Sequence, residues 1–254
     1  MKIVYLANGF LGYTILEWLK QQQDTSVVGL VVHPPERRRY GDEMIADANL
    51  PDYRVFDGST INSDATISAI KELDADLGVS IMFGYILRPD ILSVFRHGVI
   101  NLHPSYLPYN RGAYPNVWSI IEETPAGVTL HYIDQSIDTG DIIAQTRVNI
   151  EPVDTGATLY SKLEKAAYEL FTTQWPRIIA GTASRTIQPR GGTSHRVRDV
   201  ETIDQIDLDR SYTGRELINL LRARTFPPYL GAYFIHEGKK VYVSIELRYN
   251  DEDE

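Results

Sequence analysis

The stretch Lys2-Ile-Val-Tyr-Leu-Ala7, followed by the turn Asn8-Gly9-Phe10-Leu11-Gly12, decides the fold class. The first six residues suit a buried strand, and apolar residues then recur at helical spacing from Leu11 to Leu19. Val27–Val32 repeats the buried-strand pattern. A strand, a helix and a second strand in this order favour a parallel α/β sheet.

The rest of the chain extends this pattern and then changes character. The other expected elements are strands at Leu77–Ile81, Gly98–Leu102, Gly127–Ile133 and Asp141–Ile150, helices at Ile91–Phe95, Thr155–Ala180 and from Thr213 to Leu221, and a hairpin of Leu230–Ile235 with Lys240–Leu247. The loop at 189–194 marks a boundary. We therefore predict a Rossmann-like, mostly parallel sheet flanked by helices in a catalytic domain over residues 1–185. A small C-terminal module, a helix plus a β-hairpin, is predicted over residues 186–254.

Composition and charge narrow the class of protein. The chain has 254 residues, 43% hydrophobic and 23% charged, close to the globular average. The lack of cysteine excludes disulfides, cysteine nucleophiles and thiolate metal sites. The net charge of −9 without a basic run disfavours nucleic-acid binding, because phosphate neutralisation requires clustered Lys and Arg. No apolar run approaches the roughly 20 residues of a membrane helix, and the amino terminus lacks signal-peptide character. We expect a cytoplasmic protein that binds small molecules, with no membrane partner.

Two further features are expected to carry no chemistry. The six histidines are scattered, without the paired spacing of a metal site, so no metal is expected. His195 and His236 are predicted to be surface residues, and the acidic tail Asp251–Glu254 a solubilising end.

The turn after the first strand lacks the features of a dinucleotide site. It is not a complete G-x-G-x-x-G pattern, and His33 with two prolines stands where an acidic residue would contact a ribose. The glycines of this turn favour close packing of helix and strand, with some contact to an anion. NAD binding is therefore not expected.

A candidate catalytic centre comes from two segments. Asn101 and His103 are two residues apart at a strand end, so both side chains point to the same face. Asp138 follows in a glycine turn. An amide, an imidazole and a carboxylate that converge can stabilise an oxyanion, move a proton and orient the imidazole. From spacing alone, a strand terminus and an ordinary turn explain these residues equally well.

The motif Asn101-Leu-His-Pro-Ser-Tyr-Leu-Pro108 with Asp138-Thr-Gly-Asp141 resembles the folate-dependent formyltransferases over residues 1–180. This resemblance implies that Asn101, His103 and Asp138 are the catalytic residues. The segment Phe83-Gly-Tyr-Ile-Leu-Arg-Pro89 is similar to the loop that holds the pterin ring of 10-formyltetrahydrofolate. The cofactor-binding residues implied are Phe83, Gly84, Tyr85, Ile86 and Leu87, with the auxiliary His131.

Other segments resemble the nucleotide-sugar N-formyltransferases within that superfamily. Tyr109–Trp118 looks like their acceptor loop, and Leu221–Tyr233 is similar to their short C-terminal module. Arg222 and Arg224 suit a diphosphate, with a solvated or helix-capping role as the alternative. Phe226 and Tyr229 suit stacking on a base and core packing equally well. The substrate-binding candidates are Asn8, Gly9, Tyr109, Asn110, Arg111, Asn116, Arg222, Arg224, Phe226 and Tyr229.

The resemblance implies transfer of a formyl group from 10-formyltetrahydrofolate to a dTDP-linked amino-dideoxyhexose. The expected acceptor is dTDP-4-amino-4,6-dideoxyglucose, for O-antigen or other surface-glycan synthesis. A 3-amino dTDP sugar, a UDP-4-amino sugar and a catalytically silent ligand-binding module remain alternatives. The aromatic hairpin near Tyr233 and Tyr242 indicates a homodimer.

Overall fold

The computed structural model describes residues 1–250, so the predicted acidic tail lies outside the described residues. The chain divides into two compact units. Unit 1 comprises residues 1–103, 129–145 and 167–188, and unit 2 comprises residues 104–128, 146–166 and the chain from 189 onward. The predicted domain boundary at 185/186 lies close to the last of these crossings. Unit 2 also takes two earlier segments, so the two-domain division stays a prediction.

A seven-stranded sheet has the order β3-β2-β1-β4-β5-β7-β8. The pairs β1–β2, β2–β3, β1–β4 and β4–β5 are parallel, and β5–β7 is antiparallel. This confirms the predicted mostly parallel sheet. The strands are β1 (Lys2–Ala7), β2 (Ser26–Val32), β3 (Val55–Asp57), β4 (Leu77–Ile81), β5 (Val99–His103), β7 (Ala126–Tyr132) and β8 (Ile142–Val148).

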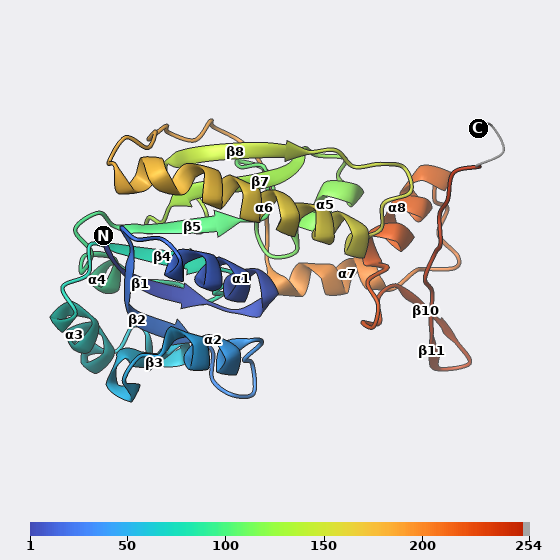
Figure 1. Cartoon of the computed structure of the whole chain (residues 1–254). Coiled ribbons are helices and arrows are strands. Elements are labelled where there is room, and N and C mark those ends of the chain that lie inside the picture. The colour runs from blue at the N-terminus through green and yellow to red at the C-terminus, as the bar shows by residue number, and fades with distance from the viewer. Residues whose placement is uncertain (251–254) are drawn as a thin grey trace. The chain divides into compact units, whose positions relative to one another are not determined.

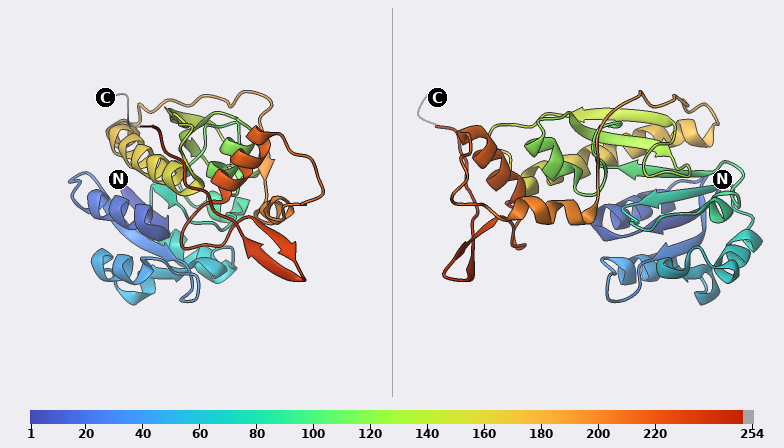
Figure 2. Two further views of the ribbon diagram at one scale, coloured as in Figure 1. Left: turned by 90° about the vertical axis from the view of Figure 1, so that its right-hand side faces the viewer. Right: turned by 180° about the vertical axis from the view of Figure 1, so that it is seen from behind.

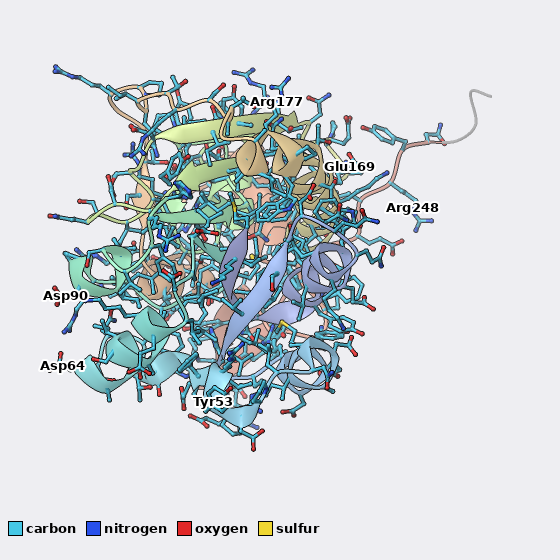
Figure 3. All side chains as sticks on the ribbon, turned by 60° about the vertical axis from the view of Figure 1, so that its left-hand side comes forward. Tyr53, Asp64, Asp90, Glu169, Arg177 and Arg248 are labelled. Carbon is cyan, nitrogen blue, oxygen red and sulfur yellow. The ribbon has the colours of Figure 1, made fainter. Side chains whose placement is uncertain are left out.

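In unit 1 the sheet is covered on both faces, as Figures 1 and 2 show. Val4 and Leu6 of β1 belong to the apolar cluster that includes Ile70 of α3 and Ile91 of α4. Tyr5 points the other way, and its hydroxyl donates to a carbonyl of α1 at 2.7 Å. The helices are α1 (Gly9–Lys20), α2 (Gly41–Ala48), α3 (Asp64–Glu72) and α4 (Pro89–Leu92). The acidic side chains of Asp64 and Asp90 point outward from α3 and α4 (Figure 3).

The long predicted helix is present as α6 (Gly156–Ile179), which begins in unit 2 and ends in unit 1. In unit 1, the ring of Phe171 lies 6.2 Å from that of Trp18 on α1. The indole of Trp175 donates to Thr25 Oγ1 at 3.0 Å, next to the amino end of β2. These contacts place the last turns of α6 beside α1 (Figure 1).

Unit 2 contains the predicted capped helix and hairpin. Thr213 and Glu216 form reciprocal hydrogen bonds at the start of α8 (Gly214–Arg224), which confirms the capping box. The hairpin strands β10 (Tyr233–His236) and β11 (Lys239–Tyr242) are shorter than predicted. The other elements of unit 2 are β6 (Arg111–Gly112), α5 (Pro115–Ile121), β9 (Ser194–His195), the 3₁₀ helix Val197–Val200 and α7 (Glu201–Asp204).

Helices α2 and α3, strand β3 and the 3₁₀ helices Asp52–Arg54 and Gly58–Thr60 have no counterpart among the predicted elements. Helix α3 buries a single side chain, that of Ile70. Strand β3 has three residues, too few to establish an alternating pattern. Packing against the sheet, rather than a strong local pattern, accounts for these elements.

Candidate functional site

The site of unit 1 lies at the carboxyl ends of the parallel strands. The strand order 3-2-1-4-5 reverses direction between β1 and β4, and ligands bind at such switch points of α/β sheets. Asn8 follows β1, Phe83 follows β4, and His103 ends β5. The residues predicted for catalysis and for the cofactor therefore surround one edge of the sheet.

Three polar side chains form a row across β4, β5 and β7. Ser80 is paired in register with Asn101, and Asn101 with His131. The Ser80 hydroxyl donates to Asn101 Oδ1 at 3.0 Å, and Asn101 Nδ2 donates to His131 Nε2 at 3.2 Å. Because the two ends of the amide have different partners, the row fixes its orientation. The bond to His131 uses one of the two hydrogens on Asn101 Nδ2, and the second hydrogen is available to a ligand.

His131 accepts from the amide because its proton is on the other ring nitrogen. Nδ1 donates to the Tyr132 carbonyl at 2.8 Å, which makes Nε2 the acceptor. The same Nε2 lies 3.5 Å from Asp138 Oδ1. A nitrogen without a hydrogen offers this carboxylate no hydrogen bond, so Asp138 has its favourable imidazole partner elsewhere.

That partner is His103, whose Nε2 lies 3.5 Å from Asp138 Oδ2. The two side chains are 8% and 14% exposed, so solvent screens their interaction weakly. A carboxylate at this distance stabilises positive charge that develops on the imidazole during a reaction. The structure thus brings together Asn101, His103 and Asp138. They can donate to a developing oxyanion, accept a proton and hold the resulting charge.

The turn that carries Asp138 has a constrained backbone. Asp138 has a positive φ of 53°, in the left-handed region. Asp134 Oδ1 accepts from the Ser136 amide at 3.0 Å and from the Thr139 hydroxyl at 2.6 Å. Gly140 is required, because a Cβ there would lie 1.9 Å from a carbonyl oxygen of β7.

The predicted cofactor loop has alternating exposure. Phe83 and Leu87 are buried in the apolar cluster of unit 1, and Tyr85 packs against it. Gly84 and Ile86 face solvent, with Ile86 66% exposed. Within residues 1–250, the amide groups of residues 84–86 donate to no protein acceptor. The loop therefore offers backbone donors and one apolar side chain, whereas its aromatic rings support it from inside.

His33 and Asn8 support this loop. The sequence did not predict this role for His33. His33 Nε2 donates to the Phe83 carbonyl, and Nδ1 accepts from Asn8 Nδ2 at 3.3 Å. Burial lowers the pKa of His33, and the bond to Phe83 opposes this shift. Asn8 Oδ1 accepts from the Arg39 amide, and Gly9 donates to the Arg39 carbonyl. The Asn8 side chain, predicted to bind substrate, is thus engaged within the protein.

In unit 2, two predicted substrate-binding asparagines are buried. Asn110 is fully buried and donates to Ser119 and Thr124 at 2.9 and 2.8 Å. Asn116 donates to the Gly156 carbonyl at 2.9 Å. These bonds favour a structural role for both. Tyr109 and Arg111 of the same loop are partly exposed.

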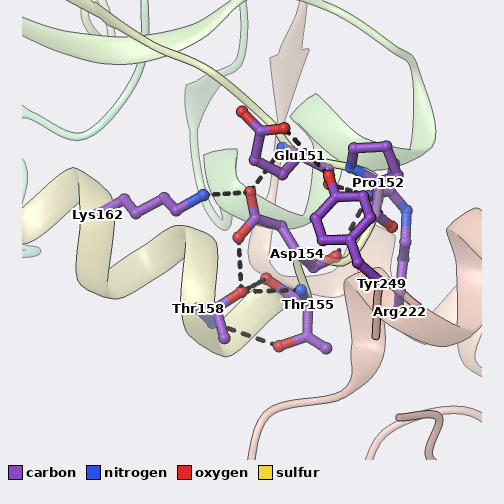
Figure 4. Close-up of polar contacts among 8 residues, drawn as sticks. All are labelled: Glu151, Pro152, Asp154, Thr155, Thr158, Lys162, Arg222 and Tyr249. Atoms are coloured by element: carbon purple, nitrogen blue, oxygen red, sulfur yellow. Dashed lines mark hydrogen bonds and ion pairs between the residues drawn. The ribbon is translucent and has the colours of Figure 1, made fainter. Parts of the chain in front are cut away.

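Arg222 is 9% exposed and lies among backbone carbonyls (Figure 4). It donates to the carbonyls of Glu151, Pro152 and Asp154 at 3.0, 3.4 and 3.2 Å. Burial lowers the pKa of this guanidinium, and the Asp154 and Glu123 carboxylates oppose the shift. The carbonyls take the hydrogens of Nη1 and Asn219 Oδ1 accepts from Nε at 2.9 Å, which favours a structural role; the contact with a diphosphate stays a prediction.

The remaining C-terminal candidates differ in their accessibility. Arg224 is paired with Asp204 through both carboxylate oxygens. The ring of Phe226 lies between Tyr160 and Tyr229, at 5.6 and 5.8 Å. Tyr229 is 55% exposed. Of these residues, Tyr229 is the most open to a ligand.

The prediction that His195 is a surface residue is wrong. Its ring stacks on Trp118 at 4.0 Å, and Nε2 lies 3.1 Å from a carboxylate oxygen of Glu122. Pairing of β9 with β6 brings it there, a contact between distant segments that no local pattern indicates. His236 is exposed, as predicted.

Residues 1–250 contain no group of three His, Asp or Glu side chains that could hold a metal ion. None of their helices has both the length and the apolar character needed to cross a membrane.

Family models match most of the chain. Residues 1–174 match the model described as formyl transferase, and residues 199–249 match the N-formyltransferase dimerization C-terminal domain. The predicted resemblance is thereby confirmed.

Two curated relatives differ in their acceptors. A methionyl-tRNA formyltransferase of Clostridioides difficile is 31% identical over 231 residues, 87% of this chain and 73% of the relative. A dTDP-4-amino-4,6-dideoxyglucose formyltransferase of Mycobacterium tuberculosis is 35% identical over 149 residues. That alignment spans 58% of this chain and 64% of the relative.

Two solved structures are similar at comparable identity. A 4-N formyltransferase from Francisella tularensis is 30% identical, with a TM-score of 0.82 and 98% of both chains covered. The formyltransferase PseJ from Anoxybacillus kamchatkensis is 32% identical, with a TM-score of 0.58. It covers 80% of this chain and 89% of its own, and was solved with UDP-4,6-dideoxy-4-formamido-L-AltNAc and tetrahydrofolate.

Proposed function

Because the chain belongs to the formyl transferase family, we propose that it transfers a formyl group from 10-formyltetrahydrofolate to a nucleotide-linked amino sugar. The observation that carries the proposal is the cluster of Asn101, His103 and Asp138 in unit 1. The cluster suits attack of a neutral amine on a carbonyl carbon, because it combines an oriented donor with a base and its carboxylate. Relatives that act on nucleotide sugars support the choice of acceptor class.

The loop at residues 83–87 fits the formyl donor. The donor, when bound, supplies the activated formyl carbon and a leaving nitrogen. The amide groups of residues 84–86 are available to the hydrogen-bonding edge of a flat heteroaromatic ring. The exposed side chain of Ile86 offers an apolar contact. His131, predicted as a cofactor residue, acts in this proposal by orienting Asn101.

The side chains divide the chemical work. Asn101 Nδ2 donates its second hydrogen to the formyl oxygen as negative charge develops there. His103 takes a proton from the attacking amine, and Asp138 stabilises the charged imidazole. The bond from the formyl carbon to the amine forms, its bond to the folate nitrogen breaks, and His103 returns the proton to that nitrogen.

We propose dTDP-4-amino-4,6-dideoxyglucose as the acceptor. The relative from Mycobacterium tuberculosis that carries this name and the 4-N formyltransferase from Francisella tularensis support the 4-amino position. Tyr109, Arg111, Phe226 and Tyr229 remain the proposed acceptor contacts. A role in surface-glycan synthesis stays a prediction from the resemblance, and a cytoplasmic location stays a prediction from the composition of the chain.

The test is mass spectrometry of the purified protein with 10-formyltetrahydrofolate and a panel of acceptors. The panel holds dTDP- and UDP-linked 3-amino and 4-amino sugars and, because of the relative from Clostridioides difficile, methionyl-tRNA. We expect a formyl mass gain on the dTDP-linked 4-amino sugar. Gain only on methionyl-tRNA would contradict the acceptor class, and gain on nothing would leave a silent ligand-binding module.

Variants separate catalysis from folding in the same assay. Asn101→Ala is expected to lower turnover on the order of 100-fold, the usual loss for one oxyanion donor. Thr25→Val, which removes the partner of the Trp175 indole at the amino end of the sheet, is expected to keep full turnover. Equal turnover in Asn101→Ala and the wild type would contradict the assignment.

We also propose that unit 2 mediates a homodimer. Residues 199–249 match a dimerization domain, and the hairpin side chains Ile235, Val241 and Tyr242 are 42%, 39% and 43% exposed. Apolar residues on an open hairpin can pair with a second copy. Sedimentation equilibrium is expected to give twice the 28.8 kDa chain mass, and a monomer at micromolar concentration would contradict this proposal.

A further inference from the structure

The segment at residues 185–188 is attached to the turn that carries Asp138, although about 45 residues of chain separate them. Thr186 and Ile142 exchange two backbone hydrogen bonds, of 2.7 and 2.9 Å. The Arg185 guanidinium donates to Asp141 Oδ2 at 2.8 Å. The end of the turn is thus anchored by both backbone and side chain.

Gln188 continues this attachment at Asp138, which carries the carboxylate, and at Gly140, two residues further on. Its Nε2 donates one hydrogen to the Asp138 carbonyl at 2.9 Å and one to the Gly140 carbonyl at 2.8 Å. The side chain is buried, at 9% exposure, so water does not readily take its place. A single amide nitrogen therefore fixes two carbonyls of the turn.

The turn needs such support because its backbone conformation is costly. Asp138 adopts a positive φ of 53°, which L-residues disfavour, and Gly140 leaves no space for a side chain. Without support, the backbone of Asp138 can relax to an ordinary conformation and carry the carboxylate away from His103. The distance at stake is 3.5 Å between Asp138 Oδ2 and His103 Nε2.

We propose that Gln188 is a positioning residue for formyl transfer, which acts through Asp138 by holding the carbonyl of Asp138 itself and that of Gly140, two residues further on. The proposal rests on the proposed function for its kinetic consequence. Gln188 acts from the backbone side of the turn, and the assigned roles of Asn101, His103 and Asp138 do not include it.

Three variants test the proposal by steady-state kinetics. Gln188→Ala removes the amide, Gln188→Glu keeps its shape but repels both carbonyls when ionised, and Gln22→Ala is the control. Gln22 Nε2 also donates to a backbone carbonyl, that of Trp18 at the end of α1. We expect kcat to fall about tenfold in both Gln188 variants with KM within twofold, and no change in Gln22→Ala.

A double-mutant cycle separates positioning from general stability. If Gln188 acts through Asp138, Gln188→Ala has no further effect on kcat in an Asp138→Asn background. A purely structural role lowers kcat by the same factor in both backgrounds and would overturn the proposal. Wild-type kcat in Gln188→Ala would overturn it as well.

Crystal structures of the wild type and Gln188→Ala give a readout without substrate. We expect the Asp138–His103 distance to lengthen beyond about 4 Å in the variant, where the ion-pair contact is lost. If the wild type transfers no formyl group, the proposed function is contradicted, and this distance alone then tests whether Gln188 positions Asp138. An unchanged distance would then overturn the positioning role.

Discussion

Replacing Ser80 with alanine removes the hydroxyl that donates to Asn101 Oδ1 at 3.0 Å and leaves the amide held by His131 alone. Ser80 is 4% exposed, so water does not readily replace the donor. A neutral hydrogen bond contributes about 1 kcal/mol net, which corresponds to about fivefold in rate if the whole contribution orients the amide. We therefore expect kcat of Ser80→Ala to fall about fivefold, far less than in Asn101→Ala.

The assay is initial-rate formation of formylated acceptor at saturating donor and acceptor, with melting temperatures measured in parallel. Thr25→Val is the matched control, because it also removes a hydroxyl partner, that of the Trp175 indole, but at the opposite end of the sheet. Both variants are expected to lower the melting temperature by a few degrees at most. Only Ser80→Ala is expected to lower kcat.

Two results would refute this reasoning. The first is wild-type kcat in Ser80→Ala, which would mean that His131 alone orients the amide. The second is an additional fivefold loss when Ser80→Ala is combined with Asn101→Ala, because an orienting residue has no effect once its target is gone.

Three further predictions concern the turn, the cofactor loop and unit 2. Gly140→Ala places a Cβ 1.9 Å from the Tyr132 carbonyl oxygen, so the turn must shift. We expect kcat to fall more than tenfold in steady-state kinetics, and the free energy of unfolding to fall by about 1–3 kcal/mol in a urea titration. The pKa of His33 is lowered in the folded state, so its contribution to stability is present above its unfolded pKa of about 6.5 and is lost as pH falls below it. Melting temperatures between pH 7.5 and 5.5 should therefore fall less in His33→Gln than in the wild type, and equal slopes would contradict this. Arg222→Ala leaves three carbonyls without their donor, so we expect about 2–4 kcal/mol of destabilisation. The KM for the acceptor is expected to stay unchanged in the molecules that remain folded. A raised KM without destabilisation would instead support the contact with a diphosphate.

The main features of the fold could be predicted from periodicity. The apolar runs of β1, β2 and β4, the stripe of α6 and the capping box at Thr213 are local signals, and each is found where it was expected. Asn101 and His103 share a face because strand geometry requires it. Their convergence with Asp138 came from a resemblance, since spacing alone favoured no single interpretation.

Other features depend on contacts between distant segments. An asparagine in a predicted binding loop carries no sign of whether it faces solvent or the interior, and Asn110 faces the interior. For Arg222 the sequence does not separate a phosphate contact from a structural role, because guanidinium groups suit both phosphates and carbonyls. Ser80 did carry a signal, as a polar residue in an otherwise apolar strand, but its partner follows only from the register of β4 and β5. Gln188 lies in a loop and carries no signal.

The row of Ser80, Asn101 and His131 makes catalytic competence a property of strand alignment. Side chains alternate between the two faces of a strand, so a slip of one residue by β5 would turn Asn101 away from both neighbours at once. Such a misaligned molecule keeps nearly the same secondary structure and loses its oxyanion donor completely. The specific activity of a preparation therefore reports the fraction of molecules in which β5 has the native register. Circular dichroism does not distinguish these molecules from misaligned ones.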